Sequence, residues 1–141
     1  MENCIFCKIV KGVIPASVAY SDDRVMAFLD IQPINPGHTL IIPKAHDALL
    51  SELDEETGAH MFVVAMRVAA ALRRSGLRCE GINLVLSDGE VAFQEIPHVH
   101  LHVIPRFRGD GFRIKFGRDY GSRPNNKELN EVASKIREVM H

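Results

Sequence analysis

Residues 98–106, His-Val-His-Leu-His-Val-Ile-Pro-Arg, begin with a strict alternation of polar and apolar side chains. Strict alternation predicts a β-strand, because successive side chains in a strand point to opposite faces. We therefore expect His98, His100 and His102 to share one face, each about 6.6 Å from the next along the strand. A buried apolar face fixes this register, since a slip of one residue would move three imidazoles into the core.

The composition indicates one ordinary globular domain, spanning residues 1–141. The chain is 46% hydrophobic and 25% charged, and its net charge of −1 gives no overall attraction to nucleic acid or anionic lipid. No apolar stretch approaches the ~20 residues of a membrane span, and the N-terminus lacks a signal-peptide layout. Three cysteines do not make a disulfide framework. We therefore expect a cytoplasmic protein with reduced thiols that binds neither nucleic acid nor membranes.

The hydrophobic pattern predicts an α+β domain. Its expected elements are, in order, a short helix at 3–11, strands at 17–20, 24–30 and 38–42, a long helix between Asp54 and Gly76, strands at 81–86 and 98–106, and a C-terminal helix after Asn125. Asn3, Asp54 and Asn125 are the expected N-caps, and Pro43 should end the third strand. Short connections between consecutive strands predict a five-stranded, mostly antiparallel sheet with the long helix packed on it.

A row of three imidazoles suits three kinds of chemistry, besides the alternative of scattered surface histidines on an edge strand. They are metal binding, nucleophilic attack on phosphorus, and anion binding by protonated rings. One metal cannot easily bind all three rings, because the outer two lie about 13 Å apart at the backbone. A nucleophilic imidazole needs one free nitrogen, an acceptor for its other N–H, and donors for the developing charge. In the preceding loop, Gly89 permits close backbone approach and Gln94 is a candidate amide donor.

Four motifs resemble those of the histidine triad nucleotide-binding hydrolases. They are Cys-Ile-Phe-Cys-Lys-Ile at 4–9, Gly-His-Thr-Leu-Ile-Ile-Pro-Lys-Ala-His at 37–46, Ala-Phe-Gln at 92–94 and the stretch at 98–106. The histidine row together with the Pro-Lys-x-His block is the most specific part. The resemblance covers roughly residues 3–106, and the segment beyond about 110 is less diagnostic.

The resemblance implies that His100 attacks the α-phosphate of a nucleotide and forms a nucleotidyl-histidine, which water then hydrolyses. The backbone carbonyl of His98 would orient the His100 ring. His102 would contact phosphate or ribose, and a histidine at this third position favours hydrolases over nucleotidyl transferases. His38, on the neighbouring strand, would be a fourth histidine close to the triad.

The resemblance also implies a purine pocket lined by Ile5, Phe6, Ile9, Phe28 and Ile31. Asp30 would take the ribose hydroxyls, and Ser87, Gln94 and Glu95 would lie near the phosphate and leaving group. An apolar slot with one carboxylate fits a flat base attached to a diol. The alternatives are that the apolar residues are plain core and that Asp30 caps a turn.

Three positions depart from the common family pattern. Ser87 stands where asparagine is frequent, Phe93 where glycine is frequent, and Glu95 where serine or threonine contacts the leaving group. Ser87 can still donate one hydrogen bond, whereas Phe93 replaces a residue that permits positive φ. A carboxylate at position 95 could protonate a departing amine or alcohol, or repel a phosphate, so the leaving group stays open.

Cys4 and Cys7 have the spacing of a zinc half-site, which needs two more ligands. The resemblance implies that His46 and His98 are those ligands, and that structural zinc ties the first helix to the sheet. The alternative is a pair of reduced thiols without metal. Outside this cluster, Cys79 is expected to be a small buried residue, and His60 and His141 to be exposed.

The sequence therefore predicts a hydrolase that cleaves at the α-phosphorus of purine nucleotide derivatives: dinucleoside polyphosphates, nucleoside phosphoramidates or adenylates. Two alternatives are a nucleotide-binding adaptor with incidental hydrolysis and a metal-dependent hydrolase using His100, His102 and the thiols. The resemblance implies a homodimer formed through the long helix and a central strand, with a continuous ten-stranded sheet. The apolar stretch 61–72 is suited to that contact, and the same pattern would also suit the core of a monomer. The basic segment 106–118 is either a solvated loop or a contact for distal phosphates or a partner subunit.

Overall fold

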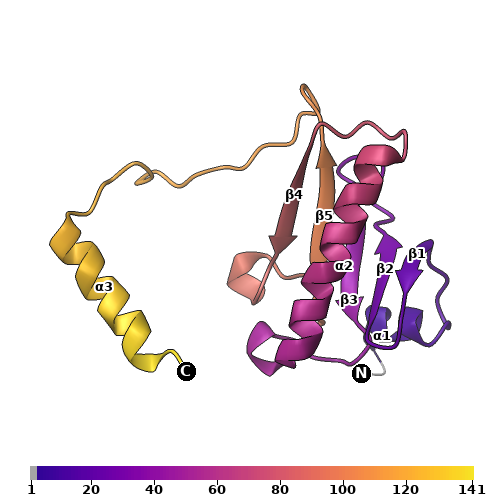
Figure 1. Cartoon of the computed structure of the whole chain (residues 1–141), viewed down its shortest axis with the longest axis horizontal. Coiled ribbons are helices and arrows are strands. Elements are labelled where there is room, and N and C mark those ends of the chain that lie inside the picture. The colour runs from indigo at the N-terminus through magenta and orange to yellow at the C-terminus, as the bar shows by residue number, and fades with distance from the viewer. Residues whose placement is uncertain (1–2) are drawn as a thin grey trace. The chain divides into compact units, whose positions relative to one another are not determined.

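The computed structural model describes residues 3–141, which form two compact units: the first ends at Gly111 and the second begins at Phe112. The first unit contains α1 (Ile5–Val10), β1 (Val18–Ser21), β2 (Val25–Leu29), β3 (Thr39–Pro43), η1 (Leu50–Glu52), α2 (Glu55–Arg74), β4 (Gly81–Leu86), η2 (Glu90–Ala92) and β5 (Leu101–Arg106) (Figure 1). The second contains α3 (Asn126–Val139). Across the described chain, no helix is both long and apolar enough to cross a membrane.

The five strands form one antiparallel sheet in the order β1-β2-β3-β5-β4. This arrangement confirms the predicted α+β class. Beta strands β1 and β2 form the expected hairpin, in which the Asp22 carboxylate accepts hydrogen bonds from the backbone N–H groups of Arg24 and Val25. The central pair β3–β5 matters most for the site, because it sets Leu40 beside His102.

Helix α2 begins where its sequence predicts. The Asp54 side chain accepts a hydrogen bond from the Thr57 N–H at 3.1 Å, which satisfies one of the free amides of the first turn. Acidic residues in the first turn and basic residues in the last complement the helix dipole. The helix ends at Arg74 with Ser75 as its C-cap, and Gly76 then adopts the positive φ of +84° that glycine tolerates.

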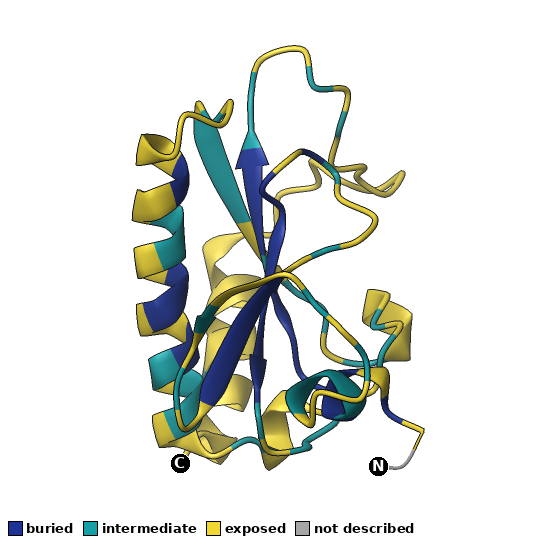
Figure 2. Ribbon diagram, turned by 90° about the vertical axis from the view of Figure 1, so that its right-hand side faces the viewer, coloured by how far each residue is buried: buried dark blue, intermediate teal, exposed yellow. Residues whose placement is uncertain are grey.

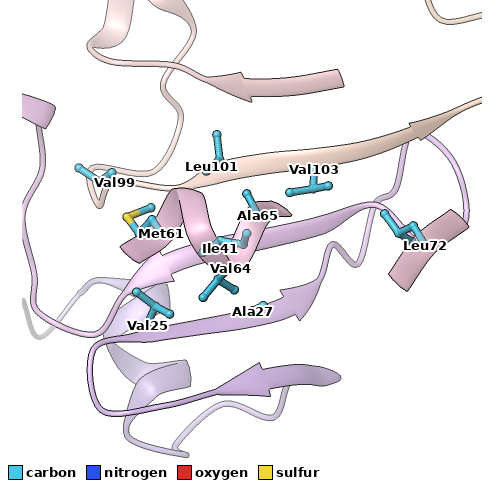
Figure 3. Packing of buried hydrophobic residues seen from close by; sticks show 10 residues of the cluster. All are labelled: Val25, Ala27, Ile41, Met61, Val64, Ala65, Leu72, Val99, Leu101 and Val103. Atoms are coloured by element: carbon cyan, nitrogen blue, oxygen red, sulfur yellow. The ribbon is translucent and has the colours of Figure 1, made fainter. Parts of the chain in front are cut away.

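Alternate residues of the strands face opposite layers of the unit. One face packs on α2, and its cluster is Val25, Ala27, Ile41, Met61, Val64, Ala65, Leu72, Val99, Leu101 and Val103 (Figure 3). The other packs on α1, with Cys4, Phe6, Cys7, Met26, Phe28, Leu40 and Ile42. In Figure 2 the buried residues concentrate in the central strands and on the side of α2 that faces them. The sheet therefore separates a structural face from the face that carries the site.

The histidine stretch keeps its predicted alternation although its first three residues lie outside the ladder. Strand β5 begins only at Leu101, and the Val99 N–H donates instead to the carbonyl of Asp47 at 2.8 Å. Val99 nevertheless packs in the α2 cluster with Leu101 and Val103. The histidines between them consequently point to the other face.

Several local expectations were wrong. Helix α1 begins at Ile5 and is capped by Cys4, whose Sγ accepts from the Cys7 N–H at 3.4 Å, so Asn3 is not its cap. Pro43 ends β3 as expected, but it is itself part of the strand and pairs with Val25, whereas the strand was predicted to stop one residue earlier. His60 is half-buried and bonded to Asp22, not exposed.

The basic segment is not uniformly solvated. Arg106 is half-buried, and its guanidinium donates to Asp110 at 2.6 and 2.9 Å and to Asn83 at 2.7 Å. In the second unit, α3 has the predicted cap, because Asn125 Oδ1 accepts from the Glu128 N–H at 2.9 Å. His141 is exposed, as expected, whereas Cys79 is only partly buried.

Candidate functional site

Four histidines gather along the paired strands β3 and β5. His98 and His100 directly precede β5, His102 lies within it, and His38 directly precedes β3. The first two and His38 are buried, whereas His102 is half-buried. The ring of His102 contacts those of His100 and His38, each with a centroid separation of 5.1 Å. Imidazoles from two neighbouring strands thus form one continuous group.

The backbone fixes the proton position on His100. Its Nδ1 lies 2.8 Å from the carbonyl oxygen of His98. Because a carbonyl only accepts, Nδ1 must carry the proton, and Nε2 of the neutral ring keeps its lone pair. The edge of the Phe6 ring packs against His100 at a centroid distance of 5.2 Å and restrains the imidazole further. In its neutral form, His100 is therefore held with the Nε2 lone pair available for nucleophilic attack.

His102 is held in the opposite tautomer through His38. The backbone N–H of Ile34 donates to His38 Nδ1 at 3.1 Å, so the proton of the neutral His38 ring resides on Nε2. That Nε2 lies 2.9 Å from His102 Nδ1, which consequently accepts. The remaining proton of His102 is then on Nε2. His100 thus offers a lone pair at Nε2, and its neighbour His102 offers an N–H at Nε2.

Burial keeps the imidazoles of His38 and His102 neutral. Burial lowers the pKa of His38, although the carboxylate of Asp30 opposes the shift. Burial, reinforced by the charges of His100 and His38, lowers the pKa of His102 to about 4. Both rings are therefore uncharged near pH 7, and the tautomers assigned from the hydrogen bonds are the ones that matter at that pH.

The histidines form part of the wall of a cleft of about 480 Å³. Its lining includes the five predicted apolar residues, Ile5, Phe6, Ile9, Phe28 and Ile31, together with Asp30, Glu95, His38, His100 and His102. Phe6 and Phe28 are also buried core residues, so for them the core alternative and the cleft position both hold. Ile31 is 97% exposed and lies at the rim.

Asp30 divides its two oxygens between a turn and the site. Oδ1 accepts from the Gln32 N–H at 2.8 Å, as the turn-cap alternative predicts. Oδ2 lies 3.6 Å from His38 Nε2. The sequence motifs missed Ile34, which also lines the cleft and whose N–H orients His38. Its side chain carries no signal of that role, because the backbone performs it.

Two residues predicted near the phosphate, Ser87 and Gln94, do not line the described part of the cleft. Gln94 holds its own loop: Oε1 accepts from the Gly89 N–H at 2.7 Å, and Nε2 donates to the carbonyls of Ala48 and Ile96 at 2.7 and 3.1 Å. Neither Gln94 nor Ser87 is among the described residues that line the cleft. The amide is thus committed to the loop in this structure.

Phe93 adopts a positive φ, the conformation for which the frequent glycine at this position is suited and a bulky residue is not. Its φ of +70° and ψ of +29° place it in the left-handed region, where it is the one residue other than glycine among residues 3–141. A bulky residue in this region stores on the order of 1–3 kcal/mol of strain. The side chain is 85% exposed and lines the cleft with Glu95.

A second cluster joins Cys4, Cys7, His46 and His98, whose Sγ and imidazole nitrogen atoms all lie within 4.8 Å of one another. His98 Nδ1 lies 3.4 Å from Cys4 Sγ, and His46 Nδ1 lies 3.2 Å from Cys7 Sγ. Two thiols and two imidazoles are a donor set that tetrahedral zinc takes.

The surroundings of the cluster fit a cation. His98 Nε2 lies 2.8 Å from the carbonyl of Pro43, so it carries the proton and Nδ1 presents its lone pair to the thiols. Burial and the adjacent Cys4 thiol raise the pKa of Cys7. A thiolate there needs positive charge, which a bound metal supplies.

Comparison with known proteins places this geometry in a family. The family model described as the HIT domain matches residues 11–109. The chain belongs to the histidine triad family. Its structure resembles that of a HIT family protein from Bacillus anthracis, with 38% identity, 99% of each chain covered and a TM-score of 0.90.

Two further histidine triad relatives bear on the two clusters. A Zn-bound histidine triad family protein from Mycobacterium smegmatis is 40% identical, with 99% of each chain covered and a TM-score of 0.75. The adenosine 5′-monophosphoramidase of Schizosaccharomyces pombe is 40% identical over 104 residues, which are 74% of each protein. A zinc-bound structure and an adenosine 5′-monophosphoramidase thus both lie among its relatives.

Proposed function

We propose that this protein hydrolyses purine nucleotide derivatives at the α-phosphorus through a covalent nucleotidyl-histidine on His100. The observation that carries this proposal is the 2.8 Å contact between His100 Nδ1 and the His98 carbonyl, which leaves the Nε2 lone pair free. That ring lines a cleft whose apolar slot lies beside the carboxylate of Asp30, as a base and its ribose require. The name of the Schizosaccharomyces pombe relative supports a nucleoside phosphoramidate over the other two predicted substrate classes.

The proposed reaction has two halves. His100 Nε2 bonds to the α-phosphorus while the bond from phosphorus to the leaving atom breaks, and the leaving atom keeps the electron pair. One water gives that atom a proton, and the remaining hydroxide attacks phosphorus and releases His100. The products are a nucleoside monophosphate and the protonated leaving group, and one water is consumed.

The neighbouring groups stabilise the charge that develops. The His98 carbonyl accepts from His100 Nδ1–H, a bond that strengthens when nucleotidylation makes the ring cationic. The Nε2–H of His102 is proposed to donate to a non-bridging phosphate oxygen. Asp30 Oδ2 is proposed to bind the ribose hydroxyls, with the apolar residues of the cleft around the base.

We also propose that Cys4, Cys7, His46 and His98 hold structural zinc. Such a site supplies binding energy that ties α1 to the segment before β5. Its effect on catalysis is through position, because His98 is both a ligand and the residue whose carbonyl orients His100. Free thiolate ligands fit a reducing compartment, so we place the protein in the cytoplasm.

A homodimer is the proposed assembly. Beta strand β4 ends the sheet, and Leu84 and Val85 on it are exposed. Phe62 and Met66 on α2 are also more than half exposed. Pairing of β4 with a second copy would produce the predicted ten-stranded sheet and cover apolar surface. Met66→Lys should shift the protein from dimer toward monomer in sedimentation velocity. A wild-type protein that sediments as a monomer would contradict this assembly.

Turnover of adenosine 5′-phosphoramidate tests the function. We expect release of AMP by the wild type, persistence of this activity in EDTA during brief assays, and loss of at least about a hundredfold in His100→Ala. Activity lost at once with chelator and restored by zinc would favour the metal-dependent alternative. Equal activity of His100→Ala would refute the proposal.

A further inference from the structure

The catalytic cleft has a neighbour that shares two of its residues. A second cavity, of about 770 Å³, is lined by Ala48, Leu49, Gly89, Glu90, Phe93, Gln94, Glu95 and Pro97. Phe93 and Glu95 line both this cavity and the cleft that contains His100 and His102. A substrate with its phosphorus at His100 and its base against α1 can therefore direct its leaving group past these two side chains.

The charge of this path is acidic. Glu90 and Glu95 line the second cavity, and neither lysine nor arginine occurs among the described residues lining either cavity. A leaving group with several phosphates would need such cations, and would meet carboxylates instead. An amine that carries a positive charge would be attracted to the same groups.

The aromatic side chain shared by the two cavities, Phe93, lies on a loop that hydrogen bonds hold in place. Phe93 is 85% exposed rather than packed in the core, despite the strain of its left-handed backbone. Directly after it, Gln94 bonds to Gly89, Ala48 and Ile96 and so ties the loop to its surroundings. An exposed aromatic ring beside carboxylates is a combination that recognises ammonium groups.

We propose that the second cavity binds the leaving group, and that Glu95 and Phe93 select nucleoside phosphoramidates whose amine carries a further cationic ammonium. This inference rests on the proposed function and adds the identity of the leaving group. Glu95 attracts the ammonium and repels anions, while Phe93 offers its ring face to the alkyl chain and the charge. Glu90 supplies a second carboxylate farther along the path.

Three substrates of matched length test the inference. Adenosine 5′-phosphoramidates of 1,4-diaminobutane, butylamine and 4-aminobutyrate differ only in the terminal group, which is cationic, neutral or anionic. We expect kcat/KM to fall in that order, with diadenosine tetraphosphate hydrolysed more slowly than the cationic phosphoramidate. In Glu95→Gln, the preference for the cationic over the neutral substrate should fall about two- to fivefold, the range of an exposed ion pair.

Two variants complete the test. Phe93→Gly suits the left-handed backbone, so it should fold and raise KM for the cationic substrate more than for adenosine 5′-phosphoramidate itself. Asp23→Asn removes an exposed charge from the β1–β2 hairpin, away from both cavities, and should leave the preference unchanged. Equal rates for the three substrates, or an unchanged preference in Glu95→Gln, would overturn the inference while the proposed function stands. No hydrolysis of any substrate would overturn both.

Discussion

The chain of hydrogen bonds from Ile34 through His38 to His102 makes a specific prediction for His38→Asn. This change removes the Nε2–H that lies 2.9 Å from His102 Nδ1. A neutral hydrogen bond contributes about 0.5–1.5 kcal/mol net, and a buried acceptor left without a donor costs about 1–3 kcal/mol. The His102 ring then relaxes by moving its proton to Nδ1, and it no longer presents an N–H to the phosphate.

We expect kcat/KM of His38→Asn to fall about tenfold to a hundredfold, since each 1.4 kcal/mol of lost transition-state binding is a factor of ten. Nitrogen-15 NMR of the imidazoles should show His102 protonated at Nε2 in the wild type and at Nδ1, or exchanging, in the variant. His38→Gln provides the matched control, because its amide N–H can reach toward His102 Nδ1. It should restore part of kcat/KM and part of the population of His102 protonated at Nε2. An unchanged His102 tautomer in His38→Asn would refute the relay.

Three further predictions address stability. Because the pKa of His102 is about 4 in the folded protein and about 6.5 in an unfolded chain, unfolding takes up protons between these values. The free energy of unfolding, measured in urea titrations, should therefore fall as pH drops from 6.5 toward 4, by at most about 3 kcal/mol from this group. His102→Gln should make the free energy of unfolding depend less steeply on pH over this range. Cys7→Ser should lower the melting temperature and abolish the zinc stoichiometry measured by mass spectrometry, and equal stability with and without chelator would contradict the metal site. Asp22→Asn should destabilise by about 1–3 kcal/mol in denaturant titrations, because Asp22 accepts from Tyr20, His60 and two backbone amides, whereas Asp23→Asn should change little.

The period of two was sufficient to predict which face each residue of the stretch 98–103 occupies. Val99, Leu101 and Val103 lie against α2 as the alternation required. The start of the strand was not predictable, because a ladder needs a partner. Beta strand β3 pairs with β5 only from Thr39 to Ile41, so residues 98–100 find other acceptors and donors.

Contacts between distant segments account for the remaining differences. His60 is polar on a helix and was expected to be exposed, but the hairpin brings Asp22 to 2.5 Å from its Nε2. Gln94 was expected to face the phosphate, but the carbonyl of Ala48, 46 residues earlier, takes its amide. Neither partner is marked in the local sequence. The role of Cys4 as the N-cap of α1 was also not predicted, since thiols are weak acceptors and rarely cap helices.

The covalent intermediate is tested most directly by trapping it. Wild-type protein would be mixed with adenosine 5′-phosphoramidate, quenched at high pH within one turnover, digested and examined by mass spectrometry. We predict an adenylyl group of 329 mass units, about the mass of AMP less one water, on the peptide containing His100 and specifically on that ring. An adduct on another residue, or active turnover without any adduct, would contradict the account.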